Sequence, residues 1–61
     1  MLRTISIDVA GTPQIFELNF DDDTWRADRS FDEGDFPLVA EVDGRRYELY
    51  SDQTLSEEEL L

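Results

Sequence analysis

The alternation of apolar and polar residues around Asp43-Gly44 constrains the fold of this chain more than any other feature. Asp-Gly favours a two-residue type I′ turn between antiparallel strands, because both central residues of that turn need a positive φ angle. The turn predicts three facing pairs on the apolar side of a hairpin: Leu38–Leu49, Ala40–Tyr47 and Val42–Arg45. On the other side it places Glu41 opposite Arg46, where a cross-strand ion pair would support the register.

A second hairpin is predicted nearer the N-terminus. Ile5, Ile7 and Val9 alternate with polar residues, and so do Phe16, Leu18 and Phe20. Between the two runs, residues 10–13 contain Gly and Pro and predict a four-residue loop. That loop predicts the facing pairs Val9–Gln14, Ile7–Phe16 and Ile5–Leu18.

The rest of the chain predicts a short third strand and a C-terminal helix. Residues 24–28 would form the strand, with Trp25 and Ala27 facing the core. In the tail, Thr54 is a candidate N-cap and Glu57 its capping-box partner, although a frayed tail is the alternative. We therefore expect one small domain over residues 1–61: mainly β (α+β), a four- or five-stranded antiparallel sheet of two hairpins with a short C-terminal helix. The predicted buried face comprises Leu38, Ala40, Val42, Tyr47 and Leu49, with Ile5, Ile7, Phe16, Leu18 and Phe20.

The charge of the chain narrows its function. Sixteen acidic residues and five arginines give a formal net charge of −11, and there is no lysine, histidine or cysteine. This composition excludes imidazole and thiol catalysis and cysteine or histidine metal sites. It also argues against direct binding to nucleic acid or to an anionic membrane, both of which need basic residues. No apolar run approaches the length of a membrane span, so we expect a cytoplasmic protein without a cofactor that meets a basic partner.

Acidic residues are densest between Asp21 and Asp35, a segment that also contains the single tryptophan. An EF-hand loop starting at Asp21 fails, because Trp25 and Arg26 occupy the positions of a ligand and the invariant glycine. A weak cation site at residues 21–23 remains an alternative. A catalytic carboxylate pair has no specific signal in so acidic a chain, and we expect no enzyme activity.

Trp25 has two interpretations. It is either a core residue that anchors a self-repelling acidic segment to the sheet, or a partly exposed anchor for a partner.

The carboxylates around Trp25 suggest electrostatic mimicry of a nucleic-acid strand. Alternate strand positions lie about 6.6–6.8 Å apart, close to the spacing of successive phosphates, on the order of 6–7 Å. Asp21 with Asp23, or Glu41 with Asp43, could form such rows.

In size and charge the whole chain, and especially "DDDTWRAD" and "FDEGD", resembles the small acidic phage-type inhibitors that imitate DNA, namely anti-CRISPR and anti-restriction proteins. The resemblance is to a class and rests on no motif. It implies a non-catalytic inhibitor that blocks the basic nucleic-acid path of a CRISPR or restriction effector, in the host cytoplasm if phage-encoded. The expected partner-binding residues are Asp21, Asp22, Asp23, Trp25, Asp28, Asp32, Glu33 and Asp35. Alternatives are a small acidic interaction module from a high-salt or GC-rich host, and an antitoxin-like adaptor that pairs through a sheet edge.

Overall fold

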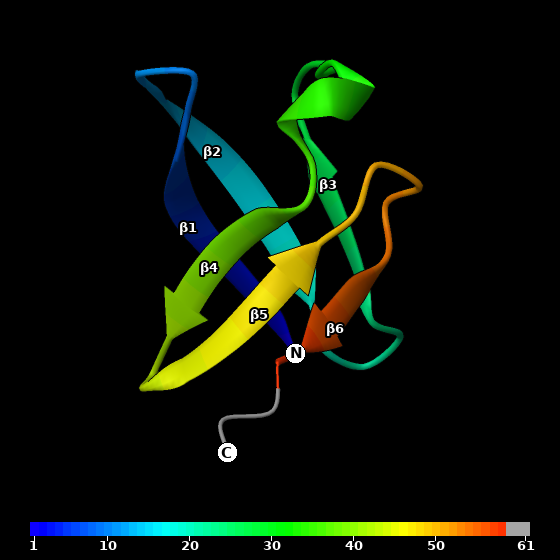
Figure 1. Cartoon of the computed structure of the whole chain (residues 1–61). Coiled ribbons are helices and arrows are strands. Elements are labelled where there is room, and N and C mark those ends of the chain that lie inside the picture. Colours follow the sequence, from blue (N-terminus) through cyan, green and yellow to red (C-terminus); the bar gives the residue numbers. More distant parts are fainter. Residues whose placement is uncertain (59–61) are drawn as a thin grey trace.

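The computed structural model describes residues 1–58, which form two three-stranded antiparallel sheets (Figure 1). In chain order the strands are β1 (Leu2–Val9), β2 (Thr12–Asn19), β3 (Thr24–Ala27), β4 (Leu38–Val42), β5 (Arg45–Leu49) and β6 (Leu55–Glu57). One short 3-10 helix, η1 (Glu33–Asp35), interrupts the connection from β3 to β4. The mainly β prediction is confirmed. The predicted single sheet of four or five strands is wrong, because β1-β2-β3 and β4-β5-β6 are separate sheets.

The β4–β5 hairpin has the predicted register, with Leu38, Ala40 and Val42 opposite Leu49, Tyr47 and Arg45. Its turn residues Asp43 and Gly44 have φ angles of 53° and 80°, as a type I′ turn requires. Arg46 lies opposite Glu41 but forms its ion pair elsewhere: its Nε lies 3.6 Å from Glu58 Oε2. The predicted ion pair between Glu41 and Arg46 does not form in the described structure.

The β1–β2 hairpin has the predicted faces but a different register. Its loop has two residues, Ala10 and Gly11, with φ angles of 52° and 86°, so Ile7 faces Gln14 and Ile5 faces Phe16. The four-residue loop is therefore wrong. The register moved by two positions, and since side chains alternate with a period of two, the same residues still face the core.

The tail forms a strand where a helix was predicted. Leu55 is buried and lies opposite Leu49, and β6 pairs with β5 along its length. Thr54 precedes this strand and Glu57 ends it, so the two residues do not form a capping box. Burial of Leu55 outweighs the local helix signal, because a helix of about two turns has little stability of its own. The last residues of the predicted helix, 59–61, lie outside the described residues.

The core lies between the two sheets, whose strands cross in Figure 1. Phe16, Leu18 and Leu49 are fully buried at its centre. Seven of the ten predicted core residues are buried, and Ile5, Phe20 and Tyr47 are half-buried against them. Trp25 and Leu55 add to this core from β3 and β6. The resulting scaffold holds the acidic loops at its margins.

Candidate functional site

The first acidic group is the turn between β2 and β3, which carries Asp21, Asp22 and Asp23 on the surface. The Thr24 hydroxyl donates a 2.6 Å hydrogen bond to Asp22 Oδ1, and the Asp21 backbone N–H donates to Asn19 Oδ1 at 2.9 Å. The Asp21 carboxylate pairs with the N-terminal ammonium group. These residues belong to a turn, so the predicted strand-spaced row of Asp21 and Asp23 is wrong.

The loop between β5 and β6 repeats this local arrangement at Asp52. The Thr54 hydroxyl donates to Asp52 Oδ1 at 2.6 Å, and the Thr54 backbone N–H donates to the same oxygen at 3.1 Å. These bonds lower the pKa of the Asp52 carboxyl, because they favour its charged form. The bond from the Thr54 hydroxyl has the largest effect. In each arrangement one residue lies between the aspartate and the threonine. These residues, Asp23 and Gln53, have positive φ angles of 56° and 69°.

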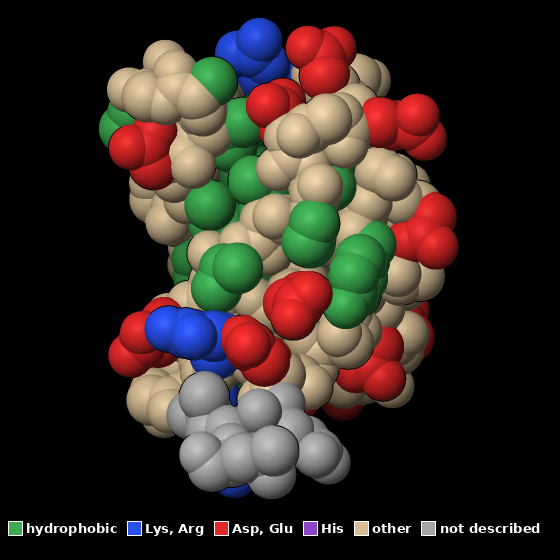
Figure 2. Space-filling model, in the orientation of Figure 1, with side chains coloured by type: hydrophobic (Ala, Val, Ile, Leu, Met, Phe, Trp, Pro, Cys, Tyr) green, Lys and Arg blue, Asp and Glu red, His purple; other side chains and the backbone are tan. Residues whose placement is uncertain are grey.

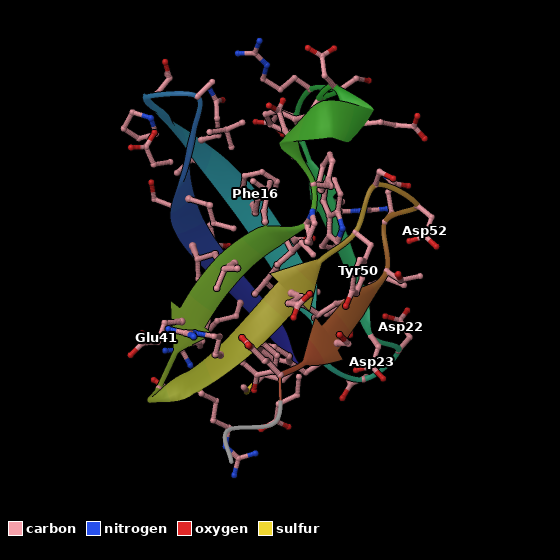
Figure 3. The ribbon with its side chains drawn as sticks, in the orientation of Figure 1. Phe16, Asp22, Asp23, Glu41, Tyr50 and Asp52 are labelled. Carbon is pink, nitrogen blue, oxygen red and sulfur yellow. The ribbon has the colours of Figure 1, made fainter. Side chains whose placement is uncertain are left out.

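The two turns are joined to each other by backbone hydrogen bonds. Trp25 N–H donates to the Gln53 carbonyl at 3.0 Å, and Leu55 N–H donates to the Asp23 carbonyl at 2.9 Å. Between these bonds the threonines of the two motifs face each other in an antiparallel bridge. We call residues 22–25 and 52–55 the twin turns. Figure 3 shows the side chains of Asp22, Asp23 and Asp52 on the same side of the molecule.

Asp52 was missed by the sequence reasoning, although a signal for it is present. The twin turns share the pattern D-x-T followed by an apolar residue, in "DDTW" and "DQTL". An aspartate two positions before a threonine favours a side-chain to backbone hydrogen bond in a turn. The pattern therefore marks both turns, but it does not show that they pair.

The second acidic group lies at the other end of β3, in the connection to β4. Asp28 follows the strand, and the η1 turn is closed by the Asp35 N–H donating to the Asp32 carbonyl at 3.0 Å. Asp28, Asp32 and Glu33 are exposed, and Asp35 is half-buried. The five positions from Asp23 to Asp28 span about 16 Å of extended chain. The predicted site is thus divided into two groups, and only the first lies beside Asp52.

Trp25 is buried between these groups, with 6% of its surface exposed. Its indole Nε1–H donates a 2.8 Å hydrogen bond to the Tyr50 carbonyl. Its ring packs edge-on to Phe16 at 5.4 Å and stacks on Phe36 at 5.3 Å between centroids. The core interpretation of Trp25 is confirmed. The tryptophan lies in an acidic segment because it fastens that segment to the core.

The arginines are distributed unevenly around the molecule. Three of them form ion pairs near the β4–β5 turn and the start of β1: Arg3 with Asp43, Arg45 with Glu57 and Arg46 with Glu58. Arg29 instead lies over the ring of Phe31, 5.7 Å from its centroid. Within residues 1–58, no ion pair involves the carboxylates of the twin turns. Figure 2 shows acidic side chains along the right-hand rim, the side on which Figure 3 places Asp22, Asp23 and Asp52.

Two hollows flank the segment Arg29–Phe31. One, of about 330 Å³, lies between this segment and the β1–β2 turn, and Asp32 and Asp35 are at its margin. The other, of about 310 Å³, lies toward the β5–β6 loop and is lined by Trp25, among others. Both volumes are at the lower limit for a small-molecule site.

Among residues 1–58, no three acidic side chains are grouped so as to hold a metal ion, the aspartates of residues 21–23 included. No helix in the same range is long and apolar enough to span a bilayer. No protein-family model, curated protein or solved structure matches this chain.

Proposed function

We propose that this protein is a non-enzymatic inhibitor that places the acidic side of its twin turns on a basic, nucleic-acid-binding surface. The observation that carries the proposal is the pairing of the two turns, which directs Asp22, Asp23 and Asp52 to one side. A protein surface that binds phosphates with arginine and lysine would accept these carboxylates in their place.

The twin turns favour binding because they are organised before a partner arrives. Asp22 and Asp52 each accept a 2.6 Å hydrogen bond from a threonine hydroxyl, which restricts their side-chain rotamers. Ordering a loop or a side chain on association costs free energy, and a pre-ordered surface avoids part of that cost. The net charge of −11 also accelerates the encounter with a cationic surface.

The other predicted contact residues have different parts in this proposal. Asp21, Asp28, Asp32, Glu33 and Asp35 extend the negative surface at the two ends of β3. Trp25 supports the twin turns from the core and does not touch the partner, because only 6% of it is exposed. Asp52 joins the contact residues.

The proposal is tested with two triple variants of equal charge. Asp22→Asn, Asp23→Asn and Asp52→Asn together remove three charges and keep the hydrogen-bond acceptors of both turns. Asparagine also tolerates the positive φ angle at position 23. The control combines Asp8→Asn, Glu17→Gln and Glu41→Gln, which lie on the strands β1, β2 and β4. Figure 3 shows Glu41 on the side of the molecule opposite the twin turns.

The experiment has two steps. Tagged protein captures basic proteins from a bacterial lysate, and each captured protein is then tested for DNA or RNA binding by fluorescence anisotropy of a labelled duplex. The parent and the control variant should displace the nucleic acid, and the twin-turn variant should not. A captured protein that binds nucleic acid equally well with and without the parent would contradict the inhibitor proposal.

A second candidate, an edge-strand adaptor, is favoured by the outer edge of β4. Val42 and Arg45 flank the β4–β5 turn as a hydrogen-bonded pair. Because hydrogen-bonded and non-hydrogen-bonded pairs alternate along a hairpin, the backbone N–H and C=O groups of Val39 and Glu41 point away from β5, toward the open edge of β4. Val39 is also 51% exposed. An extended partner segment could pair there. Val39→Pro would block such pairing, so loss of the partner in that variant, with binding retained by the twin-turn variant, would favour the adaptor.

A further inference from the structure

The hollow between the β3–β4 connection and the β5–β6 loop combines aromatic walls with a carboxylate. Trp25 and Phe36 stack with their rings 5.3 Å apart, and Phe31 meets Phe36 edge-on at 6.4 Å. Phe31 and Phe36 are half-buried, and Phe31 also stacks on Phe16 with 5.1 Å between ring centroids. Asp52, one residue of the twin turns, contributes an exposed carboxylate to the same hollow.

These walls have the chemistry of a cation site. The face of an aromatic ring attracts a cation, and a planar guanidinium also stacks on the ring. The protein already shows this contact at the hollow, because the Arg29 guanidinium lies 5.7 Å from the centre of the Phe31 ring. At about 310 Å³ the hollow suits one side chain better than a drug-sized substrate.

We propose that this hollow receives an arginine side chain of the basic partner, with its guanidinium on the half-buried Phe36 ring and facing the Asp52 carboxylate. The inference rests on the proposed function and adds a specific contact to it. The twin turns would supply general attraction, and the hollow would hold one arginine in a fixed place. Arginine fits better than lysine, since the ammonium group of lysine is compact and cannot stack.

Arg29 makes an anion the competing occupant of the hollow, and two observations oppose an anion. The face of an aromatic ring carries negative potential and attracts cations in preference to anions. The chain as a whole has a net charge of −11, which lowers the concentration of anions near its surface. In our account Arg29 weakens the binding of a second guanidinium, and its removal should strengthen it.

The test uses N-acetyl-argininamide as the probe, with N-acetyl-citrullinamide as its neutral isostere, at constant ionic strength. Two-dimensional NMR follows the indole N–H of Trp25 and the resonances of Phe31, Phe36 and Asp52. Arginine should give saturable shifts at these residues, and citrulline and inorganic phosphate should not. Equal shifts with citrulline, or shifts centred elsewhere on the protein, would overturn the proposal.

Two single variants distinguish the cation from the anion. Asp52→Asn should weaken the affinity for the arginine probe about two- to fivefold, the range for an exposed ion pair. Arg29→Gln should strengthen it by a similar factor. Loss of binding in Arg29→Gln, or unchanged affinity in Asp52→Asn, would contradict an arginine site of this composition. Asp8→Asn is the control for loss of one charge outside the lining of the hollow and should leave the affinity nearly unchanged.

The arginine-probe test and the test of the proposed function can fail independently of each other. The double variant Asp22→Asn/Asp23→Asn leaves the hollow intact, so it should bind the arginine probe normally while losing affinity for the partner. If the probe does not bind but the partner still depends on Asp22 and Asp23, the arginine site alone is refuted. If the probe binds but no nucleic-acid competitor is found, the inhibitor proposal alone fails.

Discussion

Thr24 and Thr54 face each other in an antiparallel bridge that connects two otherwise separate sheets. Thirty positions apart in the sequence, they bring the β2–β3 turn and the β5–β6 loop side by side. The bridge therefore links the fold to its candidate function, because the same contact that joins the sheets also groups Asp22, Asp23 and Asp52.

The hydrogen bond from Thr24 to Asp22 should stabilise the protein measurably. Asp22→Ala removes the acceptor and should lower the free energy of unfolding by about 0.5–1.5 kcal/mol, the usual range for one intramolecular hydrogen bond. Urea denaturation followed by circular dichroism measures the change. Asp22→Asn is the matched control, since it keeps an acceptor and removes the same charge. A loss of stability in Asp22→Asn equal to that in Asp22→Ala would show that the hydrogen bond is not the cause.

The indole N–H of Trp25 should contribute to the stability of the protein in addition to the volume of the ring. Trp25→Phe keeps an aromatic ring but removes the indole N–H that donates to the Tyr50 carbonyl, which keeps its bond from the Gln53 N–H, at a cost of about 0.5–1.5 kcal/mol for one hydrogen bond. In a domain of this size that is a large part of the total stability. Thermal denaturation followed by far-UV circular dichroism tests this. A melting temperature equal to that of the parent would contradict the assigned bond.

Replacing Ala10 in the β1–β2 turn by asparagine should stabilise the protein. Its φ angle of 52° is left-handed, which costs an alanine on the order of 1 kcal/mol, whereas asparagine visits this region readily. Ala10→Asn should therefore raise the free energy of unfolding by about 0.5–1 kcal/mol. Gly44→Ala, at φ 80° in the other hairpin turn, should have the opposite effect. If Ala10→Asn destabilises the protein in chemical denaturation, the two-residue turn is in doubt.

The contribution of Asp52 should depend on pH in a definite direction. The Thr54 hydroxyl, followed by its backbone N–H, lowers the pKa of the Asp52 carboxyl below its ordinary value of 3.8. The carboxylate therefore stabilises the folded state above pH 3.8, and this stabilisation is lost as the pH falls through the folded pKa.

Stability measurements on Asp52→Asn and Asp8→Asn from neutral to strongly acidic pH test this direction. Both variants lose one charge, so the difference between them reports the hydrogen-bonded carboxylate. Asp52→Asn should be the less stable variant at neutral pH, and the difference should vanish at low pH. A difference that grows as the pH falls would mean that the assigned shift has the wrong sign.

The parts of the fold that follow from short-range chemistry could be predicted from the sequence. Asp43-Gly44 specifies one turn type, and that turn fixed the register of β4 and β5. Alternation assigned the correct faces to β1 and β2, but it could not distinguish registers that differ by two positions. Nothing in the sequence indicates that Ala10 adopts a left-handed conformation.

The other failures share one physical cause, which is competition from long-range contacts. Thr54 and Glu57 match a helix start locally, but burial of Leu55 opposite Leu49 produces a strand. The acidic segment was likewise predicted as one surface, whereas β3 divides it. Asp52 entered the site through backbone bonds to residues about thirty positions away, which no local pattern shows.

The most direct test of the central claim is the affinity of the captured partner for the two triple variants across a series of salt concentrations. The twin-turn variant, Asp22→Asn with Asp23→Asn and Asp52→Asn, should bind more weakly than the parent, and its affinity should depend less on salt. The control variant, Asp8→Asn with Glu17→Gln and Glu41→Gln, should remain close to the parent in both respects. Equal weakening in the two variants would mean that net charge alone drives binding, and full retention by the twin-turn variant would mean that the partner binds another face.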